Sequence, residues 1–235
     1  MPRTADRTLR SIGGTSMDNG AMPTDPVPMQ RGTFERTQNH WWWRKGWGPG
    51  TRYLTWHLTF EGATALHEAA ERAGAALRTV PGIDVVPVEW LHLTMSGLGH
   101  SDEFDPSTLK RHVDSVLSAA SRTSVIPLVF DRLFIYQEGV CLSATSPGLQ
   151  ALRTLQSELI SAVGGPGHDP DEVFHPHVSL GYFSREISEE ALSDALDLAD
   201  LGPVVVASPR LSLIELSRGD RVYTWRVVAQ QEINR

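Results

Sequence analysis

Two short stretches of the sequence repeat one pattern: a histidine, an apolar residue, a hydroxyl-bearing residue and a second apolar residue. The first runs from His92 to Met95 (HLTM), and the second, from His177 to Leu180 (HVSL), begins 85 residues further along the chain. Successive side chains of an extended strand point to opposite faces, so each histidine shares a face with the hydroxyl two residues later. Each stretch therefore predicts a strand that buries one face and presents an imidazole and a hydroxyl on the other.

Two such strands facing each other would bring His92, Thr94, His177 and Ser179 into one small polar site. A neutral imidazole can take a proton from water, and an imidazolium can give one to a leaving oxygen. The two hydroxyls can donate to phosphoryl oxygens as negative charge develops there. These four groups would suffice to open a strained phosphate diester without a metal ion.

The paired motifs resemble those of the 2H phosphoesterase superfamily, which includes bacterial 2′-5′ RNA ligase-like proteins and cyclic nucleotide phosphodiesterases. His92 and Thr94 match its first motif, His177 and Ser179 its second, and Pro176 before the second histidine also fits. Tyr182 departs from the pattern, because many RNA ligase-like members carry an arginine there, and the resemblance therefore does not fix the substrate. It covers roughly residues 51 to 230.

The resemblance implies two pseudo-symmetric lobes of mixed or antiparallel sheet, flanking helices and a central cleft. It also implies a phosphodiesterase that acts on a 2′,3′-cyclic phosphate or a 2′-5′ bond of a nucleotide or RNA end, without metal or cofactor. The same machinery could join RNA ends in the reverse direction.

The pattern of elements along the chain independently indicates an α+β fold. No glycine-rich phosphate loop follows any predicted strand, which argues against a doubly wound sheet. We expect strands over residues 52–60, 83–97 and 173–183, helices over 64–77, 105–120, 146–163 and 188–199, and hairpins over 125–145 and 204–230.

Two further residues are candidates for substrate binding. His57 begins a third copy of the pattern, His57 to Phe60, and could hold substrate or orient either motif histidine. Phe183 would share a face with His177 and Ser179 by strict alternation, so it could stack on a base; a place in the core is the alternative.

The N-terminal region is rich in proline, glycine and polar residues. We expect residues 1–38 to form a flexible tail and residues 39–235 a single bilobal domain. Four tryptophans lie between Trp41 and Trp47. We favour an aromatic clamp that packs this segment onto the domain; the alternative is a base-stacking surface with Arg44 or Lys45 near a phosphate.

Other functions are compatible with parts of the sequence. A metal-dependent hydrolase could use His168, Asp169, His175 and His177, although their spacing matches no established metal motif. A non-catalytic protein could bind a nucleotide or RNA end through the tryptophans and one arginine. A Ser-His-Asp hydrolase is disfavoured, because no nucleophile-elbow pattern is present.

The composition limits which binding partners, structural sites and cellular compartment fit this sequence. The net charge of −7 argues against extended non-specific nucleic-acid binding, which requires the neutralisation of many phosphates. The only cysteine, Cys141, excludes an internal disulfide and a cysteine-based metal site. No apolar run reaches the ~20 residues that span a bilayer, and the N-terminus does not resemble a secretory signal. We therefore expect a cytoplasmic monomer with no membrane contact.

Overall fold

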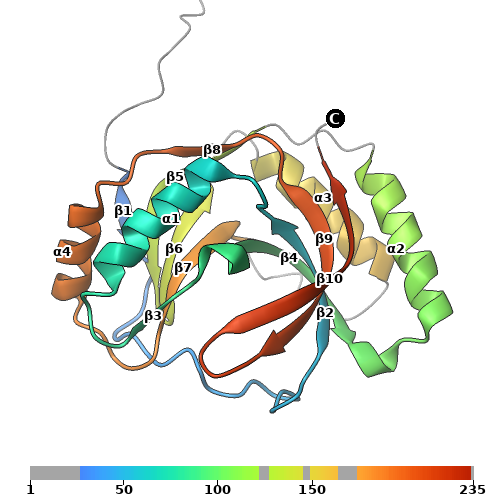
Figure 1. The fold of residues 1–235 in the computed structure, drawn as a ribbon, viewed down its shortest axis with the longest axis horizontal. Helices are drawn as coiled ribbons and strands as arrows, with labels where there is room; N and C mark the ends of the chain where they lie inside the picture. The colour runs from blue at the N-terminus through green and yellow to red at the C-terminus, as the bar shows by residue number, and fades with distance from the viewer. Residues whose placement is uncertain (1–26, 122–126, 145–148, 164–173, 234–235) are drawn as a thin grey trace, which may run out of the picture.

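The computed structural model describes residues 27–121, 127–144, 149–163 and 174–233, and its strands form two sheets (Figure 1). The larger sheet has the order β1-β5-β6-β7-β3, with β8 also paired to β5, and the smaller has the order β10-β9-β2-β4. The strands of the larger sheet are β1 (Met29–Arg31), β3 (Ile83–Val85), β5 (Leu128–Tyr136), β6 (Gly139–Ala144), β7 (His177–Phe183) and β8 (Val204–Val206). Those of the smaller sheet are β2 (Tyr53–Thr59), β4 (His92–His100), β9 (Arg210–Arg218) and β10 (Tyr223–Glu232).

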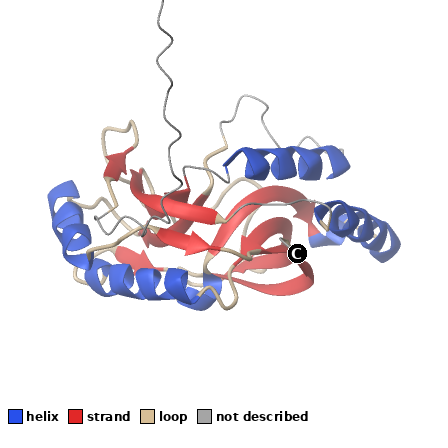
Figure 2. Cartoon of the chain, turned by 90° about the horizontal axis from the view of Figure 1, so that it is seen from above, coloured by secondary structure: helices blue, strands red, loops and turns tan. Residues whose placement is uncertain are grey.

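The helices flank the strands, as the second view shows (Figure 2). They are α1 (Thr64–Leu77), α2 (Pro106–Ala120), α3 (Leu149–Val163) and α4 (Glu189–Ala199), with 3-10 turns η1 (Val88–Trp90) and η2 (Ser101–Glu103). Asp105 caps α2 by accepting from the N–H groups of Ser107 and Thr108, and Ser188 caps α4 by accepting from that of Ala191. The α+β prediction and the hairpin that β5 and β6 form are confirmed.

The two motif strands occupy equivalent places. β4 pairs with β2, the strand before α1, and β7 pairs with β6, the strand before α3. Each of these helices packs against the motif strand of the other sheet: α1 contacts β7, and α3 contacts β4. The predicted strand over 83–97 is in fact two strands, because Pro87 ends the first segment and η1 carries the chain from the larger sheet to the smaller.

A β-bulge falls on the last residue of each motif. In the smaller sheet His57 pairs with Thr94 and Trp56 with Ser96, which leaves Met95 as the extra residue. In the larger sheet Cys141 pairs with Ser179 and Val140 with Gly181, which leaves Leu180 extra. An extra residue reverses the facing of the side chains that directly follow it, so simple alternation fails after each motif.

The apolar positions of both motifs lie in the core, as predicted. Leu93, Met95, Val178 and Leu180 are each at most 2% exposed. Fully burying such a side chain contributes about 1.5–3 kcal/mol, so the four together fix which face of each strand remains open.

The N-terminal boundary differs from the expected one. β1 pairs in parallel with β5, and the side chain of Val27 is buried. Residues 27–38 therefore belong to the domain and not to a tail, whereas residues 1–26 lie outside the described part of the chain. Within that part, no helix is long and apolar enough to cross a membrane.

Candidate active site

The two motif histidines are held in the same way. His92 Nδ1 lies 2.9 Å from the carbonyl oxygen of Trp90, and His177 Nδ1 lies 2.7 Å from that of His175. A carbonyl oxygen can only accept, so each Nδ1 carries the proton and donates it. The Nε2 atom of each neutral imidazole is then the basic nitrogen, and neither ring can rotate freely about its side chain.

The two imidazoles lie close enough to influence each other. β4 contacts β7, and both histidines remain partly exposed. Burial, together with the charge on His177, lowers the pKa of His92 to about 4 against the opposing effect of the Trp90 carbonyl. Burial also lowers the pKa of His177, against the opposing effect of the hydrogen bond to the His175 carbonyl and with a smaller lowering effect of the His175 side chain. Both imidazoles are therefore neutral at pH 7, and a phosphate bound between them would raise both pKa values.

The two motif hydroxyls differ in their surroundings. Thr94 is exposed, whereas Ser179 is 6% exposed and lies beside Tyr136 and Tyr182. Burial raises the pKa of both phenols above the usual tyrosine value, although Ser179 partly opposes the effect. Both phenols thus stay protonated, and the Tyr136 ring lies 6.1 Å from that of His177.

His57, on the neighbouring strand β2, packs directly against the first motif. Its ring stacks on that of His92, with centroids 4.4 Å apart and planes 6° from parallel. Its Nε2 lies 3.4 Å from Thr94 Oγ1, and burial lowers its pKa well below the usual histidine value. A neutral imidazole here supports both groups of the first motif, which agrees with an orienting role toward His92.

Two tryptophans that the sequence did not single out complete the surroundings of His92. The Trp225 ring meets that of His92 edge-on, with centroids 5.1 Å apart, and Trp90 packs edge-on against Trp225 at 4.8 Å. Trp225 comes from β10, near the end of the chain. Its contact with His92 joins the two opposite edge strands of the smaller sheet, and no local sequence signal indicates it.

Phe183 does not face the site. It is fully buried in the core, because the bulge at Leu180 reverses the alternation that placed it beside Ser179. Tyr182 takes that face instead and stacks on His40, with centroids 4.1 Å apart. The prediction that Phe183 binds substrate is therefore wrong.

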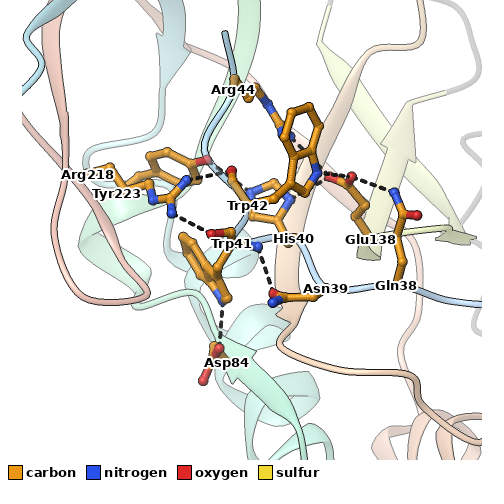
Figure 3. A network of polar contacts seen from close by, with 10 residues as sticks. All are labelled: Gln38, Asn39, His40, Trp41, Trp42, Arg44, Asp84, Glu138, Arg218 and Tyr223. Carbon is orange, nitrogen blue, oxygen red and sulfur yellow. Dashed lines mark hydrogen bonds and ion pairs between the residues drawn. The ribbon is translucent and has the colours of Figure 1, made fainter. Parts of the chain in front are cut away.

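Residues 38–50, here termed the arm, cross between the two sheets. Glu138, in the turn between β5 and β6, accepts hydrogen bonds from Gln38, Trp42 and Arg44 and contacts His40 Nδ1 at 3.0 Å (Figure 3). Burial alone would raise the pKa of Glu138, but these hydrogen bonds outweigh it and lower the pKa.

On the other side of the arm, Arg218 at the end of β9 donates to the carbonyl oxygens of Trp41 and Trp42 (Figure 3). The Trp41 indole donates to Asp84 at 2.7 Å. The predicted aromatic clamp is thus confirmed for Trp41. The side chains of Trp42 and Trp43 remain 50% and 44% exposed, so the stacking interpretation stays open for them.

A cavity of about 260 Å³ lies beside the first motif, and His57, His92 and Thr94 are among its lining residues. Arg44 from the arm and Arg218 from β9 also line it. These guanidinium groups enter from elements other than β7, where Tyr182 stands in the position that carries arginine in many relatives.

The alternative metal site involves His168 and Asp169, which lie outside the described residues. Of its other two members, His175 is exposed and His177 is tied to the His175 carbonyl. Within the described ranges, no group of three or more His, Cys, Asp and Glu side chains could hold a metal ion.

Solved structures with this arrangement of elements come from several bacteria. Escherichia coli LigT complexed with 3′-AMP has a TM-score of 0.51 at 16% identity, over 79% of this chain and 99% of LigT. TT0787 of Thermus thermophilus has a TM-score of 0.50 at 18% identity, over 77% and 97% of the two chains. ATU0111 of Agrobacterium tumefaciens has a TM-score of 0.51 at 14% identity, over 76% and 85%. At such identities the likeness concerns the fold.

No curated protein matches the chain. The comparison with protein families is more specific than the likeness of fold. Residues 65–220 match the family described as the 2′-5′ RNA ligase superfamily, and this segment contains both motifs and the strands that carry them. The chain therefore belongs to the 2′-5′ RNA ligase superfamily.

Proposed function

We propose that the protein is a metal-independent phosphoesterase that hydrolyses, or reversibly forms, a cyclic phosphate or 2′-5′ phosphodiester of a nucleotide or RNA end. The observation that carries this proposal is the matched anchoring of His92 and His177 through Nδ1. Paired acid–base catalysis needs two imidazoles whose Nε2 atoms are both available to a substrate placed between them.

In hydrolysis, one neutral histidine takes a proton from water through Nε2 as the water oxygen bonds to phosphorus. The other histidine, protonated once the phosphate anion is bound, gives its proton to the ester oxygen as the P–O bond breaks. A phosphomonoester and a free hydroxyl result, and the two histidines exchange protons with solvent before the next cycle. Thr94 and Ser179 donate to the non-bridging oxygens, where negative charge grows in the transition state.

The relatives support a nucleotide as substrate. LigT has been crystallised with 3′-AMP and with ATP, in structures whose TM-scores to this chain are 0.51 and 0.50. A 3′-nucleotide is the kind of product that opening a 2′,3′-cyclic phosphate releases. The family match further supports a ribonucleotide ester as the bond acted upon.

The test is a screen of 2′,3′-cyclic, 3′,5′-cyclic and 2′-5′-linked nucleotides, each with and without a strong chelator. We expect turnover of at least one of them that chelator leaves unchanged. His92→Ala and His177→Ala should each lose nearly all of it, about 10²–10⁴-fold for a lost general acid or base.

Three results would contradict the proposal. Activity retained in either His92→Ala or His177→Ala would contradict catalysis by a pair of histidines. Activity abolished by chelator would favour the metal-dependent alternative with His175 and His177. Tight nucleotide binding with no turnover of any substrate would favour a non-catalytic binder.

A further inference from the structure

The cavity beside the first motif has a chemical character of its own. Trp47, Tyr53 and Tyr223 supply aromatic surface, and Arg44 and Arg218 supply two positive charges. Among the described residues that line it there is no carboxylate, although the whole chain carries a net charge of −7. The cavity is therefore a local cationic and aromatic recess in an acidic protein.

The sequence of the arm builds one wall of this recess through two consecutive turns. The Trp47 N–H donates to the Arg44 carbonyl at 2.9 Å, with Gly46 at a φ of +83° in the third position of the turn. The Thr51 N–H donates to the Gly48 carbonyl, again with a third-position glycine, Gly50, at +83°. Positive φ in this position favours glycine, so Gly46 and Gly50 suit these turns.

The first turn brings Arg44 and Trp47, its two end residues, to the same cavity. The Trp47 ring lies 5.3 Å from that of Tyr53, so two aromatic side chains form one surface. Arg44 is held by Glu138 through one nitrogen, whereas its Nη1 has no hydrogen-bond partner within the described part of the chain. The Arg218 guanidinium stacks on the Trp43 ring at 3.8 Å, which fixes it at the edge of the cavity.

We propose that this cavity is the subsite for the nucleoside of the substrate, with Trp47 and Tyr53 as its base-contacting wall and Arg44 as a donor to the base or ribose. The proposal rests on the proposed function, because it assumes that the phosphate sits at His92 and Thr94 on the cavity's margin. A volume of about 260 Å³ is of the size of one nucleoside. The subsite thus fits a mononucleotide or the terminal nucleotide of an RNA.

The aromatic content distinguishes a nucleoside from a bare second phosphate as the occupant. A phosphate needs donors alone, whereas stacking on aromatic side chains contributes binding energy only when the ligand has a flat ring. Arg44 and Trp47 also precede the family-matched segment that begins at residue 65. The nucleoside preference would therefore be a property that the arm confers on this chain.

The experiment compares two cyclic phosphates, one with a nucleoside and one without. Adenosine 2′,3′-cyclic phosphate carries a nucleoside, and glycerol 1,2-cyclic phosphate presents a similar five-membered phosphate ring without one. We expect Trp47→Ala to lower the ratio of kcat/KM for the nucleotide to that for the glycerol ester about tenfold, the typical effect of losing one base–aromatic stack. Trp47→Phe, which keeps a ring, should restore most of the ratio.

Arg44→Ala is matched with Lys45→Ala, which removes the same charge from the adjacent, exposed residue of the same turn. The Arg44 variant should lower the ratio, and the Lys45 variant should leave it unchanged. Thermal unfolding of each variant checks that the arm remains folded. Equal losses on both substrates, or no loss on either in the Trp47 variant, would overturn the subsite.

A second measurement separates this inference from the proposed function. If the wild-type protein turns over neither cyclic phosphate, calorimetric titration with adenosine 3′-monophosphate still tests the cavity. If the wild type binds the nucleotide and Trp47→Ala binds it about tenfold more weakly, the nucleoside subsite is supported and the proposed phosphoesterase activity is contradicted. No binding, or binding that Trp47→Ala leaves unchanged, would reject the subsite.

Discussion

The imidazole of His57 lies flat against that of His92, with ring centroids 4.4 Å apart and planes 6° from parallel. The contact arises because His57 pairs with Thr94 across the β2–β4 ladder, next to the bulge at the motif's last residue. His57 is 2% exposed, and its Nδ1 has no hydrogen-bond partner among the described residues. It therefore carries an uncompensated polar atom next to the proposed chemistry.

Replacing His57 should separate activity from stability. His57→Phe keeps a ring to stack on His92 but removes the nitrogen that faces Thr94 and the unpaired one. We expect unchanged or higher stability, since a buried unpaired polar atom costs about 1–3 kcal/mol, together with about tenfold lower kcat. Urea unfolding and steady-state kinetics check this, with His57→Ala as the destabilised comparison. Wild-type kcat in the Phe variant would show that His57 has only a packing role.

The lowered pKa values predict that activity is greatest under mildly acidic conditions. The reaction needs one neutral and one protonated imidazole, and in the free protein the pKa of His92 is about 4 and that of His177 is below the usual histidine value. As pH rises above about 6.5, the doubly neutral form dominates, so kcat/KM should fall about tenfold for each pH increment of one. The profile of kcat should lie at higher pH, because bound phosphate raises both pKa values. A kcat/KM that rises steadily from about pH 6 to about pH 9 would contradict this assignment.

The arm depends on Glu138. Glu138→Ala removes the acceptor shared by Gln38, Trp42 and Arg44, so we expect the free energy of unfolding to fall by about 1–3 kcal/mol. Nucleotide KM should rise as Arg44 loses its anchor. The matched control is Glu186→Ala, since the Glu186–Arg36 pair is 3.7 Å long and largely exposed, and such pairs contribute less than about 1 kcal/mol. Equal effects of the two substitutions would mean that the arm is not held through Glu138.

Because the bulge at Leu180 places Phe183 in the core and Tyr182 on the site face, we expect opposite effects of substituting these two residues. Phe183→Ala should destabilise the protein by about 3–5 kcal/mol, as a cavity in the core does, while Phe183→Leu should keep the activity of each folded molecule. Tyr182→Phe should alter stability little and lower activity, because it removes the hydroxyl beside Ser179. Denaturant curves and kinetics on the three variants test this, and a catalytic loss confined to Phe183→Leu would reverse the assignment.

The sequence predicted the parts of the site that depend on local periodicity. His92 with Thr94, and His177 with Ser179, are separated by one residue and precede the bulges, so alternation placed them correctly. A glycine inside a strand can mark a bulge, and Gly181 follows the second motif directly. Glycine alone does not say which residue is extra, however. Pairing with β6 sets the register beyond Leu180. It therefore also decides that Tyr182, and not Phe183, lies on the same face as Ser179.

The remaining parts of the site depend on long-range pairing. The Trp225 ring contacts that of His92 although β10 and β4 are opposite edge strands of the smaller sheet. Arg44 meets Arg218 because the arm crosses from one sheet to the other. Pro87 did mark a break in the strand over 83–97, but a proline says nothing about which sheet follows. The short strand β1 has no apolar alternation, so residues 27–38 were indistinguishable from a tail.

Because α1 packs against β7 of the larger sheet and α3 against β4 of the smaller sheet, the two halves of the molecule should affect each other's unfolding. β4 relies on a helix that follows β6, and β7 relies on a helix that follows β2. Neither motif strand, expressed with its own sheet alone, would keep the helix that covers it, so unfolding one half would uncover the motif strand of the other. The two halves should consequently denature together in a single transition, and a hinge that swings them apart as independent bodies is not available to this chain.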